Sequence, residues 1–200
     1  MKIFATAALA ASVSFVPFSA MARDLTVGLS ASTTSMDPQF YVGGANSALA
    51  RNIFDGLVNQ GSHQEIQPAL AESWERIDDT TWQFRLRAGV KFHDGSDFTA
   101  DDVVASIGRI PLASTNSPSS FAAYVKAITE VVAIDPLTVQ IKTDGPTPLL
   151  LNNLSRIAIL PAEHAKTTTE EMNKGVGVIG TGPFKFVSWT PDADVVVERN

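Results

Sequence analysis

Six residues near the C-terminal end of the chain match G-x-G-x-x-G, the glycine pattern of dinucleotide-binding proteins: Gly175 to Gly180. In those proteins a strand precedes the glycines and a helix begins within them, so that backbone N–H groups meet the pyrophosphate. Here a polar loop precedes the glycines, and Pro183 follows almost at once. The sequence therefore argues against a nucleotide site and predicts a loop whose glycines adopt positive φ angles.

The acidic residues and histidines do not have the spacing of a metal site. Asp94, Asp97, Asp101 and Asp102 lack the closing glutamate of a calcium loop, and the last two suit the first turn of a helix. The three histidines (His63, His93 and His164) contain no H-x-x-x-H pair, and there is no cysteine. No metal and no cofactor is expected. The chain also has no nucleophile elbow or P-loop, so an enzyme is the least favoured class.

Five residues have the character of a ligand-binding site. Tyr41 and Asn46 flank the Gly43-Gly44 pair, and glycine lets a ligand approach the backbone closely. Binding clefts combine apolar walls with a few placed polar groups, and loops commonly carry them. Phe121 lies beside another loop. Arg156 follows an apolar helix and is suited to meet a carboxylate, although a solvated surface arginine explains it equally well. The predicted site residues are Tyr41, Gly44, Asn46, Phe121 and Arg156.

Hydrophobic periodicity predicts the elements around these residues. Residues 25–29 and 81–87 alternate as strands do, and residues 131–134 and 137–142 flank Asp135-Pro136 as a β-hairpin. Helices are expected from Asn46 or Ser47 to about Leu57, from Thr99 through Ile110, over 121–127, and from Thr147 to Leu154. Residues 68–74 are interpreted as a helical turn and 167–177 as a loop. Residues 185–189 and the last residues form two further strands.

The N-terminus has the features of a secretory signal peptide over residues 1–22: Lys2, an apolar stretch, and an A-x-A site before Arg23. Export from the cytoplasm is therefore predicted, and the family resemblance described below implies the periplasm as the location. The formal net charge of −6 argues against a nucleic-acid partner, which requires a basic face. At 44% hydrophobic residues the chain can bury a substantial core. A monomer is expected.

Several ordered segments resemble the family 5 extracellular solute-binding proteins, the dipeptide-, oligopeptide- and nickel-binding receptors of bacterial ABC importers. They are LAESW, TWQFRLRAGVKFHDG and FTADDVVAS within residues 68–110, and GTGPFKFVSW with VVVERN at the end. The resemblance implies an α/β fold of the periplasmic binding protein type II class. Residues 23–200 would form the N-terminal lobe, with mixed sheets flanked by helices and an inserted subdomain at about 62–165. The C-terminal lobe is expected to be absent.

The same resemblance implies a function. The receptor would capture a peptide between two lobes and deliver it to the permease and ATPase subunits of the importer, performing no chemistry itself. The loop at residues 41–46 and the helix entry at Phe121 would face the cleft. The alternative is the same fold with a non-peptide ligand, such as a nickel chelate, an opine or an oligosaccharide. With one lobe alone, useful affinity is not expected.

Overall fold

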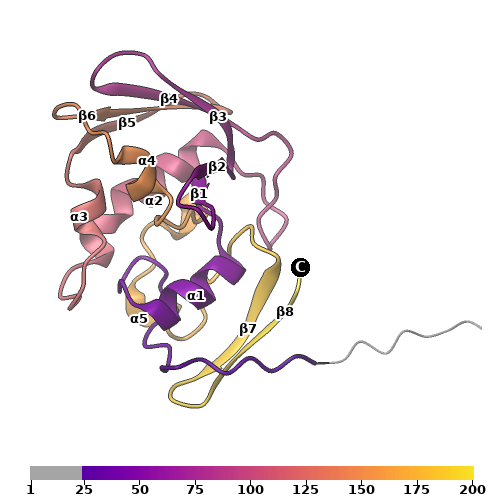
Figure 1. The fold of residues 1–200 in the computed structure, drawn as a ribbon. Helices are drawn as coiled ribbons and strands as arrows, with labels where there is room; N and C mark the ends of the chain where they lie inside the picture. The colour runs from indigo at the N-terminus through magenta and orange to yellow at the C-terminus, as the bar shows by residue number, and fades with distance from the viewer. Residues whose placement is uncertain (1–23) are drawn as a thin grey trace, which may run out of the picture.

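The computed structural model describes residues 24–200, so the predicted signal peptide at residues 1–22 lies outside the described residues. The fold combines α-helices with antiparallel strand pairs (Figure 1). In chain order the elements are α1 (Gly44–Ile53), β1 (Val58–Gln60), β2 (Ile66–Pro68), β3 (Ala71–Arg76), β4 (Thr81–Leu86), α2 (Ala100–Ala113), α3 (Ala122–Val125), β5 (Ile128–Asp135), β6 (Thr138–Thr143), α4 (Leu150–Leu154), a 3₁₀ turn (Ala162–His164), α5 (Thr169–Met172), β7 (Phe184–Thr190) and β8 (Asp194–Arg199).

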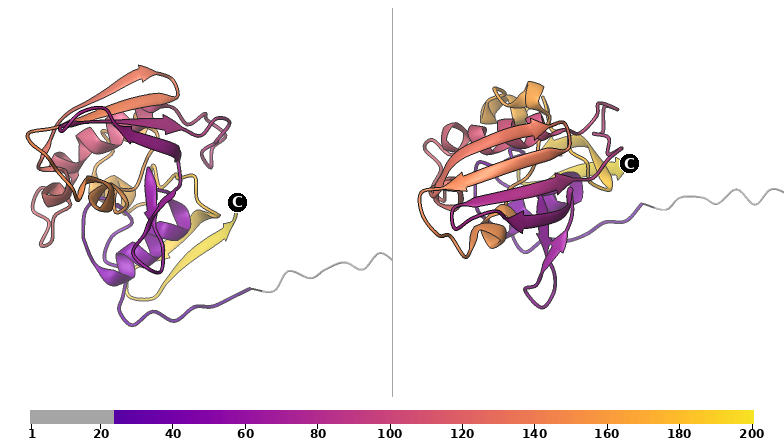
Figure 2. Two further views of the ribbon diagram at one scale, coloured as in Figure 1. Left: turned by 45° about the horizontal axis from the view of Figure 1, so that its top comes forward. Right: turned by 90° about the horizontal axis from the view of Figure 1, so that it is seen from above.

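The largest sheet has four strands in the order β3-β4-β6-β5. Strand β4, one of its two central strands, is the one predicted at residues 81–87, and it buries Phe84 and Leu86 while Arg85 stays exposed. The predicted hairpin is also confirmed, since β5 and β6 pair antiparallel. Helix α2 lies against β5 and β6 on one face of this sheet (Figures 1 and 2). The largest hydrophobic cluster fills the space between them.

Helix α2 begins and packs as its sequence predicts. The Asp102 carboxylate accepts a hydrogen bond of 2.7 Å from the backbone N–H of Thr99, which satisfies a donor that the helix leaves free. Val103, Ile107 and Ile110 recur at helical spacing and are buried. The helix continues to Ala113, past Pro111. This helix therefore fixes the inner face of the large sheet.

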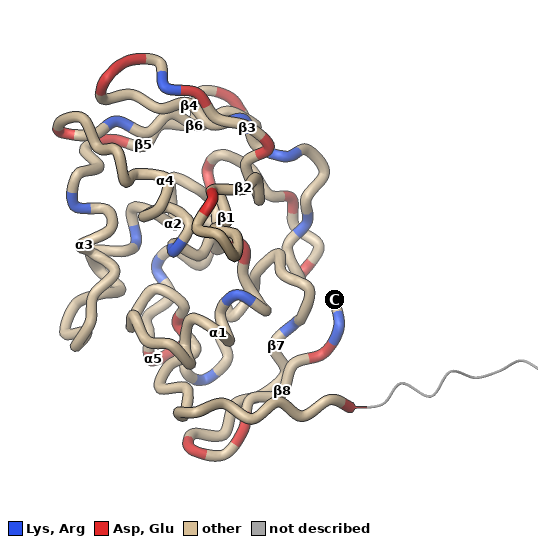
Figure 3. The backbone as a smooth tube through the Cα atoms, in the orientation of Figure 1, with Lys and Arg blue, Asp and Glu red and all other residues tan. Residues whose placement is uncertain are grey.

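The outer face of the large sheet is polar, and its charged side chains form ion pairs between neighbouring strands. Arg85 on β4 meets Glu72 on β3 at 2.9 Å, and Lys142 on β6 meets Glu130 on β5 at 2.7 Å. Figure 3 shows acidic and basic residues interspersed over these strands. Exposed pairs of this kind contribute little stability. The inner face is therefore the one that organises the fold.

A second, smaller hydrophobic cluster joins α1, α5 and the β7–β8 hairpin. Met36, Ile53, Phe54 and Met172 form its buried centre, and Phe186 and Trp189 on β7 pack against it. The prediction of a strand at residues 25–29 was wrong, because this segment is irregular and its Leu25, Val27 and Leu29 side chains are exposed. Within residues 24–200 the sheet expected there therefore consists of β7 and β8 alone, paired antiparallel.

Three further predictions need correction. Residues 68–74 do not form a helical turn, since Ala71–Arg76 is strand β3 and pairs with β4. The expected loop at 167–177 contains α5, capped by Thr168 and Glu171. Helix α1 begins at Gly44 and ends at Ile53, rather than running from Asn46 or Ser47 to Leu57. In the first case pairing with a neighbouring strand outweighed the local preference of the segment.

A buried ion pair that the sequence did not reveal anchors the loop before α1. Arg109 on α2 donates to both carboxylate oxygens of Asp37, at 3.0 and 2.7 Å, and both side chains are almost completely buried. Gln39, also buried, donates to the backbone oxygens of Ser106 and Ala158. The loop that leads to Tyr41 is thus held against α2 and residue 158.

Candidate functional site

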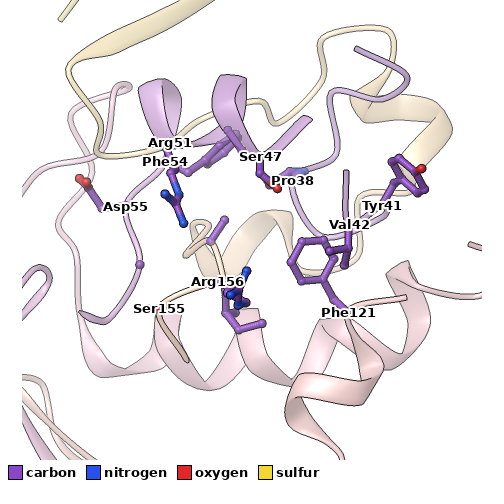
Figure 4. A pocket seen from close by; sticks show the side chains of 14 residues that line it. Pro38, Tyr41, Val42, Ser47, Arg51, Phe54, Asp55, Phe121, Ser155 and Arg156 are labelled. Atoms are coloured by element: carbon purple, nitrogen blue, oxygen red, sulfur yellow. The ribbon is translucent and has the colours of Figure 1, made fainter. Parts of the chain in front are cut away.

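An open pocket lies where three separate segments of the chain meet (Figure 4). The first segment is the loop before α1 together with α1 itself, the second is the start of α3, and the third follows α4. The lining residues are Pro38, Tyr41, Val42, Ser47, Ala50, Arg51, Phe54, Asp55, Gly56, Phe121, Ser155, Arg156, Ile157 and Ala158. Apolar and polar side chains both line the pocket, and ligand sites combine the two.

Tyr41 lines the pocket from the loop before α1. Its ring lies against Gly43, where a β-carbon would overlap the ring atoms. Gly43 has a φ angle of −139°, so the glycine is required here by the close approach of the ring and not by the backbone conformation. Of the two glycines, Gly43 is therefore the one that makes room for the Tyr41 ring.

Phe121, the residue directly before α3, lines the pocket and is 4% exposed. The backbone N–H of Val42 donates to the oxygen of Ser119 at 3.0 Å, which joins the Tyr41 loop to the Phe121 loop. The Phe121 ring also packs against Tyr124, with centroids 5.9 Å apart. Phe121 is therefore a fixed apolar wall.

Arg156 follows α4, is exposed, and lines the same pocket. Its guanidinium carbon lies 5.7 Å from the centroid of the Tyr124 ring, within the range of a cation–π contact. Figure 4 shows its side chain directed toward the space between α1 and Phe121. The structure thus brings Tyr41, Phe121 and Arg156 into one pocket from positions far apart in the sequence.

Asn46 and Gly44 do not line this pocket. The Asn46 amide oxygen accepts from the Thr34 N–H at 3.2 Å, and its nitrogen donates to the Ser35 oxygen at 3.4 Å, so the side chain secures the preceding loop. Gly44 is the first residue of α1, and space around its α-carbon is open. Their role in ligand binding stays a prediction that the geometry does not favour.

Sequence reasoning missed the face of α1 that lines the pocket: Ser47, Ala50, Arg51 and Phe54. These residues fall at positions i, i+3, i+4 and i+7, the spacing of one helix face. In the sequence, Leu49, Ile53 and Leu57 also fall at i, i+4 and i+8, and this apolar stripe favours a different face of the helix. Arg51 adds a second guanidinium to the pocket.

The glycine-rich loop at 175–180 has the predicted backbone. Gly175 and Gly177 have φ angles of 92° and 71°. Gly180 serves another purpose, because a β-carbon there would overlap the carbonyl oxygen of Ile53. Next to it, the His93 ring accepts from the Gly180 N–H at 3.2 Å and contacts the Gly182 oxygen at 3.0 Å. These residues are explained by loop packing.

Residues 24–200 contain no group of three or more histidine, aspartate or glutamate side chains placed to hold a metal ion. In the same residues no helix has the length and apolar character needed to cross a membrane. The pocket that contains Tyr41, Phe121 and Arg156 is the candidate ligand site of the described residues.

The fold is that of a type II periplasmic binding protein. OppA of Burkholderia pseudomallei has a TM-score of 0.75 at 22% identity, over 86% of this chain and 37% of that chain. The binding protein AgaA of A. tumefaciens R10, solved with agropinic acid, has a TM-score of 0.70 at 30% identity, over 83% of this chain and 33% of that one.

The chain belongs to the bacterial extracellular solute-binding proteins, family 5, whose middle region matches residues 65–200. The glutathione-binding protein GsiB of Pectobacterium atrosepticum is 30% identical over 181 residues, which cover 89% of this chain and 34% of that protein. The periplasmic murein peptide-binding protein MppA of Escherichia coli is 31% identical over 182 residues, covering 83% and 34%. The chain spans about a third of the length of these relatives.

Proposed function

We propose that this chain is part of the periplasmic substrate-binding component of an ABC importer and that it contributes one wall of a peptide-binding cleft. Captured peptide would be delivered to the permease and ATPase subunits of the inner membrane, with no chemical step in the receptor. Closure of two lobes around a ligand is a common hinge motion of such folds. Tyr41, Phe121 and Arg156 are the proposed contacts.

The observation that carries the proposal is the convergence of these three side chains in one open pocket. They come from three segments that are separated by 80 and 35 positions along the chain (121 − 41 and 156 − 121). The peptide as ligand is supported by the relatives, because MppA is a murein peptide-binding protein.

A non-peptide ligand is the second candidate. AgaA, which is 30% identical to this chain, was solved with agropinic acid, and NikZ of Campylobacter jejuni, also 30% identical, was solved with Ni(L-His). The same lobe therefore serves several ligand classes among similar proteins. We keep an opine, a nickel chelate and an oligosaccharide as the alternatives.

Export to the periplasm belongs to the proposal as well. Residues 1–22 have the charge pattern and A-x-A site of a signal peptide, and the relative MppA is periplasmic. Expression in a Gram-negative host should give a periplasmic product whose N-terminal residue is Arg23. Retention of Met1 in a cytoplasmic product would contradict export.

The proposed division of the lobe places an inserted subdomain at about residues 62–165. Most of the larger hydrophobic cluster comes from this range, including Phe84, Val103 and Ile141. The smaller cluster draws mainly on residues before and after it, such as Ile53 and Met172. This distribution supports two packing units within one lobe.

Titration of the ¹⁵N-labelled chain, followed by amide chemical shifts, tests the function. The ligands are tetraalanine, an opine, nickel–histidine and a sugar oligomer, each raised to millimolar concentration because weak affinity is expected from a single wall. Tetraalanine should shift the amides of Tyr41, Phe121 and Arg156 more than those of the outer sheet.

The four titrations distinguish the peptide receptor from a receptor for another ligand class. Shifts at the pocket with tetraalanine support the peptide receptor. Shifts there with only one of the other three ligands move the function to that ligand class. If none of the four ligands shifts the pocket amides, or if tetraalanine shifts only remote residues, the proposed site is wrong.

A further inference from the structure

Gln39 is completely buried beside the pocket and is not one of its lining residues. It belongs to the loop before α1, which supplies Pro38 and Tyr41 to the lining. A buried amide costs free energy unless its N–H donors and its oxygen are hydrogen-bonded. The partners of the Gln39 amide therefore show what the residue holds together.

The Gln39 side chain joins its own loop to the segment after α4. Its Nε2 donates to the Ala158 oxygen at 2.8 Å and to the Ser106 oxygen at 3.1 Å. Its Oε1 accepts from Arg109 at 3.1 Å. Ala158 lines the pocket, whereas Ser106 and Arg109 belong to α2, which packs on the large sheet. One amide thus fixes two lining segments against the same helix.

The third lining segment is attached to the same loop. The hydroxyl of Ser114, directly after α2, donates to the backbone oxygen of Gln39 at 3.4 Å. Ser114 begins the connection that leads to Phe121, and later in that connection the Ser119 oxygen accepts from the Val42 N–H at 3.0 Å. Gln39 therefore has hydrogen bonds toward both of the other segments that line the pocket.

The segment after α4 is held on its other side by backbone pairing. Ala158 forms an antiparallel bridge with Gly56, which also lines the pocket. Figure 4 shows Asp55, the neighbour of Gly56, and Tyr41 at opposite sides of the pocket. The Gly56 side is therefore fixed by the backbone, and the Tyr41 side depends on the length and the donors of the Gln39 amide.

We propose that Gln39 is a positioning residue of the pocket: it sets the spacing between the Tyr41 loop and the Ala158 segment, and ligand affinity depends on that spacing. A site already held in its competent geometry avoids the free-energy cost of ordering during binding. When that geometry is populated only part of the time, the apparent affinity falls by the same fraction. This inference rests on the proposed function and names a residue that controls the same site.

Gln39→Met tests the proposal, because it has a similar length but no N–H donor for the Ala158 and Ser106 oxygens. Gln39→Asn is the milder second variant. It keeps an amide that is one methylene shorter and so draws back from the Ala158 oxygen. It should change the same quantities in the same direction, and it decides the matter if Gln39→Met does not fold.

The matched control is Thr143→Val, on β6 and outside the pocket. The buried Thr143 hydroxyl lies 3.2 and 2.7 Å from the backbone oxygens of Thr80 and Gly145. The control therefore also removes a buried donor to backbone oxygens, and urea unfolding should show a loss of stability in both proteins. Only the Gln39 variants should change the pocket.

The first measurement is the titration of the ¹⁵N-labelled chain with tetraalanine, followed at the amides of Tyr41, Phe121 and Arg156. Gln39→Met should weaken tetraalanine about tenfold, because the walls then hold the competent spacing about a tenth of the time. Thr143→Val should bind as the wild-type chain does. Equal weakening in the two variants would show that affinity follows general stability, which overturns the proposal.

The second measurement needs no ligand. The Val42 amide donates to Ser119, and the Ile159 amide donates to the Asp55 oxygen at 2.9 Å, so both report on the walls. In Gln39→Met their hydrogen exchange should be about tenfold faster relative to the β4 amides. In Thr143→Val the ratio of these rates should stay as in the wild-type chain.

The two measurements separate the possible failures. Unchanged exchange at Val42 and Ile159 in the Gln39 variants overturns the positioning role. Faster exchange with unchanged tetraalanine affinity shows that the spacing does not control binding, and it overturns the proposal as well. If tetraalanine does not shift the pocket amides of the wild-type chain, the proposed peptide function fails, and the exchange rates still decide whether Gln39 holds the walls.

Discussion

Asp37 and Arg109 form a buried ion pair, in which each charge depends on the other for its partner. Arg109 also donates to the Thr167 oxygen at 2.9 Å, and Asp37 accepts from the Thr169 hydroxyl at 2.7 Å. One arginine thus connects the loop before α1 with the segment that leads into α5. The pair determines how three distant segments meet.

We expect Arg109→Met to lower the free energy of unfolding by about 3–5 kcal/mol, because it leaves the Asp37 carboxylate buried without its cation. Asp37→Leu should have a similar effect for the reciprocal reason. The double variant should lose less than the sum of the two single changes. Urea unfolding followed by circular dichroism measures all three, and strict additivity would contradict the coupling.

Two glycines give a matched test of backbone approach. Gly180→Ala places a methyl group against the carbonyl of Ile53 and should cost about 1–3 kcal/mol of stability. Gly108→Ala, in the middle of α2 with open space around it, should raise stability by about 0.5–1 kcal/mol. Thermal unfolding of both proteins decides the matter. A stable Gly180→Ala variant would refute the steric account.

Predicting the site from sequence was limited by distance along the chain. Tyr41, Phe121 and Arg156 were predicted because loops commonly carry binding residues, and the structure places them in one pocket. The pair of Asp37 and Arg109 gave no such sign, since the residues are 72 positions apart and each is ordinary in its local context. Arg51 was missed for a different reason, because the spacing of the α1 residues was assigned to the other helix face.

At the level of elements, two side chains of α2 hold the segment after α4. The Ser106 Oγ accepts from the Leu160 N–H at 2.9 Å and donates to the Leu160 oxygen at 3.1 Å, all of it buried. Asp102, one turn earlier on the same helix, accepts from the Ala162 N–H at 2.7 Å. Polar side chains on the helix thus replace a strand partner for this segment.

Ser106→Ala should therefore cost about 1–3 kcal/mol, because both polar atoms of the Leu160 backbone lose their partner in a buried place. Hydrogen exchange should show the Leu160 amide exchanging faster, with the sheet amides less affected. Ser62→Ala, at an exposed position, is the control and should change neither quantity. Unchanged protection at Leu160 would show that the hydroxyl is not its partner in solution.

The turn between β5 and β6 makes stability depend on pH. The backbone N–H of Leu137, 2.8 Å from Asp135, and the Thr138 hydroxyl hold the pKa of the Asp135 carboxyl below its ordinary value of 3.8. A lowered folded-state pKa gives stability that is present above the unfolded pKa and is lost as the pH falls through the folded pKa.

Asp135→Asn can still accept the Leu137 hydrogen bond but cannot titrate. The variant should therefore lose less stability than the wild-type chain between about pH 5 and about pH 3. Midpoints of thermal unfolding across this range give the comparison. Asp79→Asn, an exposed change elsewhere, is the control. Identical pH profiles for the wild-type chain and Asp135→Asn would rule out the turn as the source.

Elements with strong local signals were predictable, and those that depend on partners were not. Strand β4 and helix α2 have clear periodicity and a clear cap, so their sequence predicts them. The segment that forms strand β3 was predicted as a helical turn. Its extended conformation comes from pairing with β4, and its own residues do not specify that conformation. The α5 helix had a readable signal, the Thr168-to-Glu171 capping box, which was overlooked.

At the scale of the whole molecule, the described residues contain two hydrophobic clusters. His93 lies between them. Phe92 beside it belongs to the larger cluster, and the Gly180–Gly182 turn packs on Ile53 of the smaller one. The ring nitrogen Nδ1 accepts from Gly180, so Nε2 is left to donate to the Gly182 oxygen at 3.0 Å. The Asn200 side chain donates to that same oxygen at 3.1 Å.

His93→Ala should therefore separate the stabilities of the two clusters rather than lower both equally. Amides of β7, β8 and Gly180 should exchange faster, while those of β4 and β6 keep most of their protection, since the large sheet retains its own core. The total loss should be about 1–3 kcal/mol, because the Gly180 N–H loses its partner and the Gly182 oxygen keeps only the hydrogen bond from Asn200. His63→Ala, on an exposed turn, should leave every rate unchanged. Equal acceleration in both sheets would show that the lobe opens as a single unit and that His93 does not join two parts.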